Sequence, residues 1–236
     1  MTNEVFWLSC AAGFCTTLGA VMLFVKRHWS NRSLAFFLGL ASGVMVAVVF
    51  FDMLPSAFLF SHFYIPALGI VIGFIVMAVF NHVRMRNISR SDSLLALGYL
   101  IMAGIILHDL PEGMAIALGG EMKARTGLVI AMGIAIHNIP EGMAIAAPFL
   151  MGGMRRKSIF IKTLLIGFIT PLGTLIGAWA ARQVPDQLPA LLGFASGVMI
   201  YLVVFQLWPE ARGRDRIGRF CGFLVGMMVI ALATFM

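Results

Sequence analysis

The sequence has few charged residues. Only 11% of its 236 residues are Asp, Glu, Lys or Arg, whereas 61% are hydrophobic. Soluble domains carry about a quarter charged residues, so this chain cannot cover a surface that faces water. Its net charge is +7, but the basic residues fall in short segments between apolar runs. That distribution fits orientation in a membrane and gives no sign of a nucleic-acid partner.

Cysteine is also scarce. The three cysteines, Cys10, Cys15 and Cys221, lie inside apolar runs and lack the paired spacing of a metal site or a disulfide framework. We interpret them as small buried hydrophobic residues. The first apolar run has no basic segment before it and is followed by further runs, so we expect a first membrane span rather than a cleaved signal peptide.

Long apolar runs dominate the chain. A helix needs about 20 mostly apolar residues to cross a bilayer. Eight runs meet this condition: 4–25, 33–55, 64–82, 93–118, 126–151, 158–181, 188–209 and 217–236. The connections between them are too short for a soluble domain. The sequence therefore predicts an all-α, polytopic membrane protein in which residues 1–236 form a single eight-helix domain.

The basic residues lie mostly on one side of the predicted membrane. The odd-numbered connections and the adjoining span ends hold 14 of the 17: Lys26, Arg27, Arg32, Arg84, Arg86, Arg90, Arg155, Arg156, Lys157, Lys162, Arg212, Arg214, Arg216 and Arg219. Only Lys123, Arg125 and Arg182 fall on the other side. Because cytoplasmic connections are enriched in Lys and Arg, we expect both termini to lie outside the cell.

Two segments of the sequence are repeated. Residues 108–117 and 137–146 are identical at eight of ten positions, and Ala-Ser-Gly-Val-Met occurs at 41–45 and again at 195–199. In both copies of Ala-Ser-Gly-Val-Met, a polar residue (Asp52 or Gln206) stands seven residues after the methionine, and a proline stands ten residues after it. Each repeat falls on two spans of opposite direction. This pattern is typical of transporters built from inverted repeats, whose substrate site lies near the midplane.

Four acidic residues are predicted to lie inside spans: Asp52, Asp109, Glu112 and Glu141. An ionised carboxylate at the bilayer centre costs ~2.5–3.5 kcal/mol even on the lower scale, so each needs a compensating partner. No Lys or Arg is predicted at that depth. A bound cation is the simplest partner, and protonation is the other.

The spacing of the polar residues predicts a metal site. His108 and Glu112 are four residues apart and share one helix face, and His137 and Glu141 repeat the arrangement. Two imidazoles with several carboxylate oxygens suit Zn, Fe, Mn, Co, Ni or Cd better than Mg or Ca.

Two further pairs of residues accompany these motifs. Asp109 and Asn138 each stand three residues before a motif glutamate, and Gly113 and Gly142 each follow one directly. We expect the two glycines to let another backbone approach closely.

At these motifs the chain resembles the ZIP family, the zinc- and iron-regulated-transporter-like proteins, and above all its bacterial and GufA-like members. The resemblance rests on His-Asp-Leu-Pro-Glu-Gly at 108–113 and His-Asn-Ile-Pro-Glu-Gly at 137–142. It implies a 3+2+3 arrangement in which helices 1–3 and 6–8 are related by inversion and helices 4 and 5 carry the metal site. It also implies inward transport of divalent metal, without a prosthetic group.

The resemblance further implies roles for individual residues. One ion would be held by His108, Glu112, His137 and Glu141, with Met45 as a methionine ligand from helix 2. A second ion would be bridged by the two glutamates and flanked by Asp109 and Asn138. Asp109 departs from the Asn that is frequent in the first motif. Thr170 stands where similar proteins commonly have a Glu, so we expect the second site to be weak or absent.

We therefore expect a transporter of divalent transition-metal ions, zinc first and also Cd, Fe or Mn, that works by alternating access in a plasma membrane, such as a bacterial inner membrane. Asp52 is expected either to attract cations at the outer mouth or to accept hydrogen bonds from Ser or Thr hydroxyls on a neighbouring helix. A proton-conducting bundle and an intramembrane metal-dependent hydrolase are the alternatives. The chain lacks the His-Glu-x-x-His pattern of metalloproteases, and metal dependence would separate transport from proton conduction. The sequence leaves open whether two copies form a homodimer.

Overall fold

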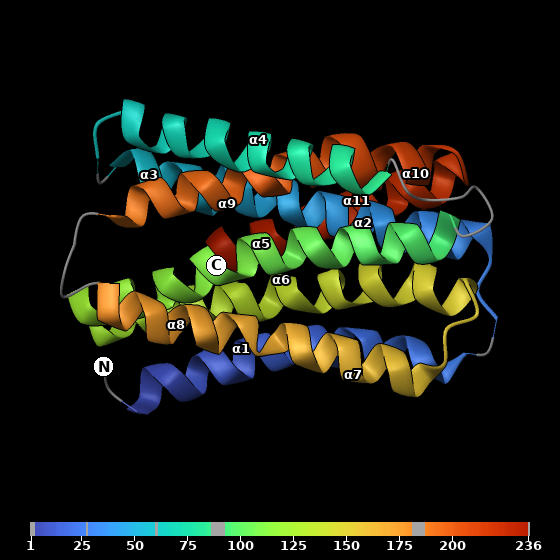
Figure 1. Cartoon of the computed structure of the whole chain (residues 1–236), viewed down its shortest axis with the longest axis horizontal. Helices are drawn as coiled ribbons and strands as arrows, with labels where there is room; N and C mark the ends of the chain where they lie inside the picture. The colour runs from blue at the N-terminus through green and yellow to red at the C-terminus, as the bar shows by residue number, and fades with distance from the viewer. Residues whose placement is uncertain (1–2, 27, 60, 86–92, 181–186, 236) are drawn as a thin grey trace.

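The computed structural model describes residues 3–26, 28–59, 61–85, 93–180 and 187–235, and within these residues all regular structure is helical (Figure 1). The predicted all-α fold is confirmed. The elements in chain order are α1 (Asn3–Met22), η1 (Leu23–Val25), α2 (Asn31–Val48), η2 (Val49–Met53), α3 (Leu54–Leu59), α4 (Tyr64–Met85), α5 (Ser93–Met122), α6 (Ala124–Met151), α7 (Arg156–Gly167), α8 (Ile169–Ala180), α9 (Leu188–Leu202), η5 (Val203–Leu207), α10 (Trp208–Arg212) and α11 (Arg216–Phe235).

The helices join into spans. Among the described residues, eight helical stretches are long and apolar enough to cross a membrane: Asn3–Val25, Asn31–Leu59, Tyr64–Val83, Leu94–Glu121, Arg125–Met151, Arg156–Ala180, Leu188–Arg212 and Arg216–Phe235. The prediction of eight spans is confirmed. The main differences are at the ends of the second and seventh spans. These run to Leu59 and Arg212, beyond the predicted ends at 55 and 209.

The second and seventh spans continue past their prolines because each contains one π-helical turn. The turns η2 and η5 are both five residues long, and both begin four residues after the methionine of Ala-Ser-Gly-Val-Met. The N–H of Leu54 donates to the carbonyl of Val49, and the N–H of Trp208 donates to that of Val203. The sequence repeat thus extends to the backbone. π-turns of this kind occur frequently at functional sites.

The sixth span is divided, in contrast, into α7 and α8. Pro171 has no N–H to donate to the carbonyl of Gly167, and the break between the helices falls at Gly167 and Phe168. The N–H of Phe168 donates to Leu165 in a shorter, three-residue step. The predicted span at 158–181 is therefore one membrane crossing made of two helices.

The described basic connections gather at one end of the molecule. In Figure 1 the connections α1–α2, α6–α7 and α10–α11 lie at the right, and α5 meets α6 at the left, where Lys123 and Arg125 are. We call the end with the connections α1–α2, α6–α7 and α10–α11 the basic end. Arg27, Arg86, Arg90 and Arg182 lie outside the described residues.

Of the basic residues grouped with the seventh connection, Arg219 lies furthest into a span. Arg219 lies one turn into α11, is buried and stacks its guanidinium over the rings of Trp208 and Phe220 at 4.4 and 4.8 Å. Aromatic faces attract a guanidinium, which is why this charge can leave the water-facing segment.

The spans pack as two bundles. In the first, which we call the motif bundle, α6 packs against α1 and α5, and α5 packs against α8. In the second, the flanking bundle, α2 packs against α11, and α4 packs against α9. The two bundles meet mainly where α5 lies on α9 and α6 lies on α2.

The largest hydrophobic cluster fills the half of the molecule toward the basic end. It combines Leu38 and Met45 of α2 with Ile101 of α5, Phe149 of α6 and Leu202 of α9. All five side chains are fully buried. Apolar side chains therefore occupy the interior of this half in this conformation.

Candidate metal centre

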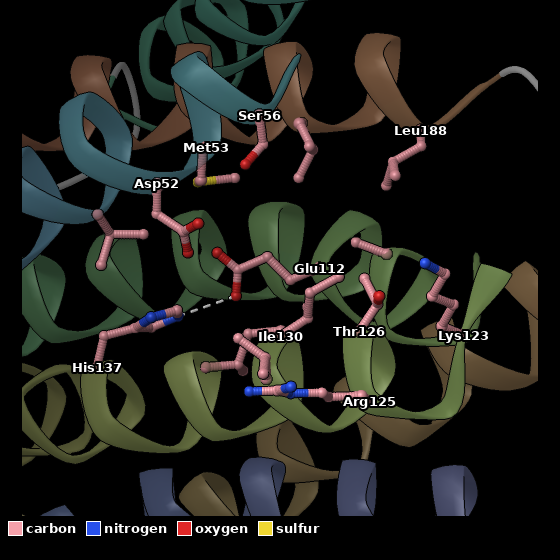
Figure 2. A pocket seen from close by; sticks show the side chains of 15 residues that line it. Asp52, Met53, Ser56, Glu112, Lys123, Arg125, Thr126, Ile130, His137 and Leu188 are labelled. Carbon is pink, nitrogen blue, oxygen red and sulfur yellow. Dashed lines mark hydrogen bonds and ion pairs between the residues drawn. The ribbon is translucent and has the colours of Figure 1, made fainter. Parts of the chain in front are cut away.

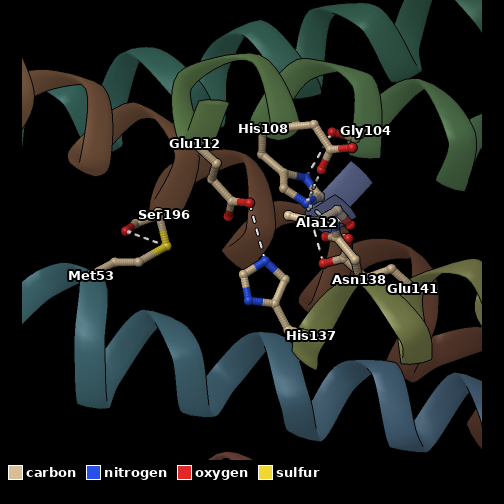
Figure 3. A network of polar contacts seen from close by, with 10 residues as sticks. Ala12, Met53, Gly104, His108, Glu112, His137, Asn138, Glu141 and Ser196 are labelled. Atoms are coloured by element: carbon tan, nitrogen blue, oxygen red, sulfur yellow. Dashed lines mark hydrogen bonds and ion pairs between the residues drawn. The ribbon is translucent and has the colours of Figure 1, made fainter. Parts of the chain in front are cut away.

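Two motif helices bring the predicted polar residues together near the middle of the spans. The helices α5 and α6 pack side by side, and their motif residues face each other (Figure 3). The polar side chains of both motifs are 3% exposed or less: His108, Asp109, Glu112, His137, Asn138 and Glu141. Such burial is costly for ionisable groups unless they are paired or bind a metal.

Each histidine pairs with the glutamate of the other motif. His108 Nε2 lies 3.2 Å from Glu141 Oε1, and His137 Nε2 lies 3.1 Å from Glu112 Oε2 (Figure 3). The His and Glu of one motif share a helix face, as predicted, but their nearest polar partners are on the neighbouring helix. The two motifs therefore form one site with two His–Glu pairs, each of which joins α5 to α6.

The orientation of His108 prepares it to bind an ion. Its Nδ1 donates a hydrogen bond to the Gly104 carbonyl at 2.9 Å, so Nε2 is left facing Glu141. In the neutral imidazole Nε2 would be an acceptor that faces another acceptor. A proton or a metal ion between them removes this conflict. A backbone carbonyl that fixes the other ring nitrogen is the usual arrangement for a metal-binding histidine.

Asp109 adds a second carboxylate beside His108. Its Oδ1 lies 3.4 Å from His108 Nε2, yet both of its oxygens are buried without a hydrogen-bond partner. One ligand atom each from His108, Asp109 and Glu112 fit within 4.8 Å of one another. A buried carboxylate that lacks a donor is what a cation would satisfy.

Asn138 turns partly toward α1. Its Nδ2 donates to the Ala12 carbonyl at 2.9 Å, while its Oδ1 is buried without a partner. The amide therefore anchors α1 to the site and can offer only its oxygen to an ion.

Met45 lies in the large hydrophobic cluster together with Ile105 and Ala144, which stand three residues from His108 and Glu141 respectively. The structure does not bring its sulfur into the hydrogen-bonded network. Its role as a ligand, like those of the motif residues, remains a prediction.

Thr170 lies beside the site on α8. A Cβ on Gly113 would overlap the Thr170 carbonyl oxygen, and the Thr174 hydroxyl donates to the Gly113 carbonyl at 3.0 Å. The Thr170 hydroxyl is buried without a partner. The helix α8, which packs on this side of α5, thus offers the site hydroxyl groups but no carboxylate.

The motif glycines permit close contact between backbones, as predicted. Gly113 meets α8 at Thr170, and a Cβ on Gly142 would overlap the Thr16 carbonyl of α1. The residues next to both glutamates are thereby held by a neighbouring helix.

A cavity of about 600 Å³ leads to the centre from the end opposite the basic one (Figure 2). Lys123, Arg125 and Thr126 line it near the α5–α6 connection, and Glu112 and His137 line its inner part. Asp52, Met53 and Ser56 line it from the flanking bundle. His108, Asp109 and Glu141 do not line the cavity and are fully buried. One His–Glu pair is therefore reachable from the cavity, and the other is enclosed.

Met53 and Ser56 were not predicted as residues of the site. The Ser196 hydroxyl donates to the Leu192 carbonyl at 2.7 Å and lies 3.9 Å from the Met53 sulfur, which is part of the cavity wall (Figure 3). Nothing distinguished Met53 among 17 methionines except its position next to Asp52.

An all-helical protein with eight membrane-length spans and a buried centre of imidazoles and carboxylates has the features of a membrane transporter for transition-metal ions. The family described as ZIP zinc transporter matches residues 84–234, and the chain belongs to this family.

Similar proteins cover nearly the whole chain. It is 32% identical to the zinc transporter ZupT of Chlorobium phaeovibrioides, over 96% of this chain and 95% of that protein. It is 27% identical to ZupT of Streptococcus mutans, over 97% and 95% of the two chains. It is also 32% identical to the zinc transporter ZTP29 of Arabidopsis thaliana, over 86% and 83%. All three are named as transporters, which agrees with the prediction that the chain is not an enzyme.

Proposed function

We propose that this protein carries divalent transition-metal ions, zinc first, across a bilayer through the centre between α5 and α6. The observation that carries the proposal is the buried set of three carboxylates, Asp109, Glu112 and Glu141, for which the described residues provide no Lys or Arg partner. In the described part of the chain, the side chains that form ion pairs with them are those of the two histidines. A dehydrated divalent ion supplies the missing positive charge, and mixed imidazole and carboxylate ligands favour Zn, Cd, Fe or Mn over Mg. The metal is the cargo, so no prosthetic group is required.

His108, Asp109, Glu112, His137 and Glu141 are the proposed ligands, with the Oδ1 of Asn138 and the sulfur of Met45 as further candidates. Two features support this assignment. The first five side chains converge within one buried centre. The Nδ1–H of His108 is already used by a carbonyl, which leaves its Nε2 for the ion.

Transport by alternating access is supported by the closed half of the molecule. The cavity reaches the centre from one end, while the hydrophobic cluster around Met45, Ile101 and Phe149 fills the other. An ion that enters the cavity can leave at the basic end only after the two bundles shift relative to each other. We infer that the motif bundle moves against the flanking bundle, which is the type of rearrangement that transporters with inverted repeats use.

The distribution of charges and the family resemblance support the proposed direction of transport. If the basic end is cytoplasmic, as the positive-inside rule requires, the cavity opens to the outside and both termini lie outside. Uptake into the cell is then the proposed direction, in a plasma membrane such as the bacterial inner membrane. Residues 1–236 would act as one domain, in which spans 1–3 and spans 6–8 are inverted repeats around the two motif helices α5 and α6.

Uptake of Zn, Cd, Fe, Mn and Mg into vesicles that contain the purified protein tests the function. We expect saturable uptake of Zn and Cd and no Mg uptake above empty vesicles, because Mg prefers an all-oxygen shell and gives up its water reluctantly. A folded preparation that moves none of the five metals would contradict the proposal and favour proton conduction.

Access from the cavity tests the proposed conformations. In a variant without native cysteines, Ser56→Cys should react with a membrane-impermeant thiol reagent added outside, and Zn should slow the reaction. Ala144→Cys, fully buried in the closed half, is the matched control and should stay unreactive from that side. Equal reaction at both positions would rule out the proposed closure.

A further inference from the structure

The cavity has an acidic wall that faces the accessible His–Glu pair. We propose that Asp52, Glu112 and His137 form an outer binding site for a divalent transition-metal ion, occupied before the ion reaches the enclosed His108–Asp109–Glu141 group. This inference rests on the proposed function and adds Asp52 as a ligand. It would make the path a series of two sites, one open to the cavity and one enclosed.

The position of Asp52 is set by the π-helical turn η2. The turn inserts an extra residue into the second span, and Asp52 is exposed to the cavity from this turn. Figure 2 shows its carboxylate directed toward Glu112 and His137 on the opposite wall. A Cβ placed on Gly133 of α6 would lie 3.9 Å from Asp52 Oδ2. Asp52 therefore reaches across the boundary between the two bundles.

The opposing residues have atoms free to bind an ion. Glu112 Oε2 accepts from His137 Nε2, but the other carboxylate oxygen, Glu112 Oε1, is buried without a hydrogen-bond partner. The Nδ1 of His137 is also buried without a partner. The Glu112–His137 pair thus has one oxygen and one nitrogen without a hydrogen-bond partner beside the cavity.

The charges favour a cation at this position. Two carboxylates from facing walls enter a largely apolar cavity, where repulsion between like charges is stronger than in water. Lys123 and Arg125 line the same cavity, but neither forms an ion pair with Asp52 or Glu112 in the described part of the chain. A divalent ion that contacts both carboxylates and the imidazole would remove the repulsion. Two oxygens and one nitrogen again suit Zn or Cd.

The outer site would also connect metal binding to movement. Asp52 belongs to the flanking bundle, whereas Glu112 and His137 belong to the motif bundle. An ion held by all three joins the two bundles while the cavity is open. The ion must release Asp52 before the motif bundle can shift and carry it toward the basic end.

Equilibrium binding of Cd²⁺ to the purified, detergent-solubilised protein tests this inference. The wild type should show two classes of site. Asp52→Asn should weaken the lower-affinity class at least tenfold and leave the tighter class unchanged, because it removes one charged ligand of the outer site alone. His108→Ala should weaken the tighter class and leave the lower-affinity class unchanged. Gln206→Ala, at the equivalent position of η5 and outside the cavity, is the matched control and should leave both classes intact.

Two outcomes would overturn the inference: Asp52→Asn that binds both classes with wild-type affinity, or a wild type with a single class. Asp52 makes no hydrogen bond or ion pair with the residues that the structure describes, so Asp52→Asn should unfold at the wild-type temperature. Asp52→Glu should restore part of the lost affinity. Binding does not require flux. If the binding results hold while no metal is transported, the outer site stands and the proposed function fails.

Discussion

In metal-free protein, removing either member of the His108–Glu141 pair should destabilise the fold strongly, and removing both should restore much of the loss. The two groups lie 3.2 Å apart and are fully buried. Loss of one partner from a buried pair costs about 3–5 kcal/mol because the other is left uncompensated, whereas two apolar residues of similar size are often tolerated. We therefore expect His108→Leu/Glu141→Leu to unfold at a higher temperature than either single variant, as measured by thermal unfolding in detergent with a chelator.

The matched comparison combines His108→Leu with Glu112→Leu. These residues belong to the same motif but are not each other's closest polar partners. The coupling energy should exceed about 2 kcal/mol for His108 with Glu141 and stay below about 1 kcal/mol for His108 with Glu112. Equal coupling in both cycles would mean that the cross-motif pairing is wrong.

Substitution of Gly142 by alanine should be the most damaging small change in α6. An added Cβ would overlap the carbonyl oxygen of Thr16, which is backbone of α1 and cannot rotate away. The helices must separate, which costs about 1–3 kcal/mol or more and, for a chain of this size, should lower the unfolding temperature by roughly 10 °C at the upper value. The measurement is again thermal unfolding in detergent.

Gly133→Ala is the matched control in the same helix. The nearest atom to its added Cβ is Asp52 Oδ2 at 3.9 Å, which is an ordinary contact. Because alanine favours a helix over glycine by about 1 kcal/mol, this variant should be as stable as the wild type or slightly more stable. Equal destabilisation by both substitutions would show that the α1–α6 contact is not the reason for Gly142.

Much of the fold follows directly from the sequence. The eight apolar runs and the one-sided distribution of basic residues depend only on local composition, so they predicted the spans and the end at which the described basic connections gather. The second and seventh spans extend four and three residues beyond the ends that were read from the apolar runs. The π-turns η2 and η5 precede Pro55 and Pro209 and let the helix continue past them. The composition of the sequence does not predict such turns.

The sequence predicted the motif residues that the structure brings together, but not their pairing. The spacing of four residues placed His108 with Glu112 on one helix face, but the register between α5 and α6 decides which partner is nearest, and that register is a property of packing. The same applies to Asn138, whose amide meets the Ala12 carbonyl. A hydrogen bond between residues 126 positions apart leaves no local pattern.

The most direct test of metal passage through the paired motifs is Zn uptake into vesicles by the wild type and by Glu112→Ala/Glu141→Ala, with Glu210→Ala as control. Glu210 pairs with Arg214 at the basic end, away from the cavity. We expect saturable uptake by the wild type and the control, and uptake no greater than that of empty vesicles for the double variant. Undiminished Zn uptake by a folded double variant would contradict transport through this centre.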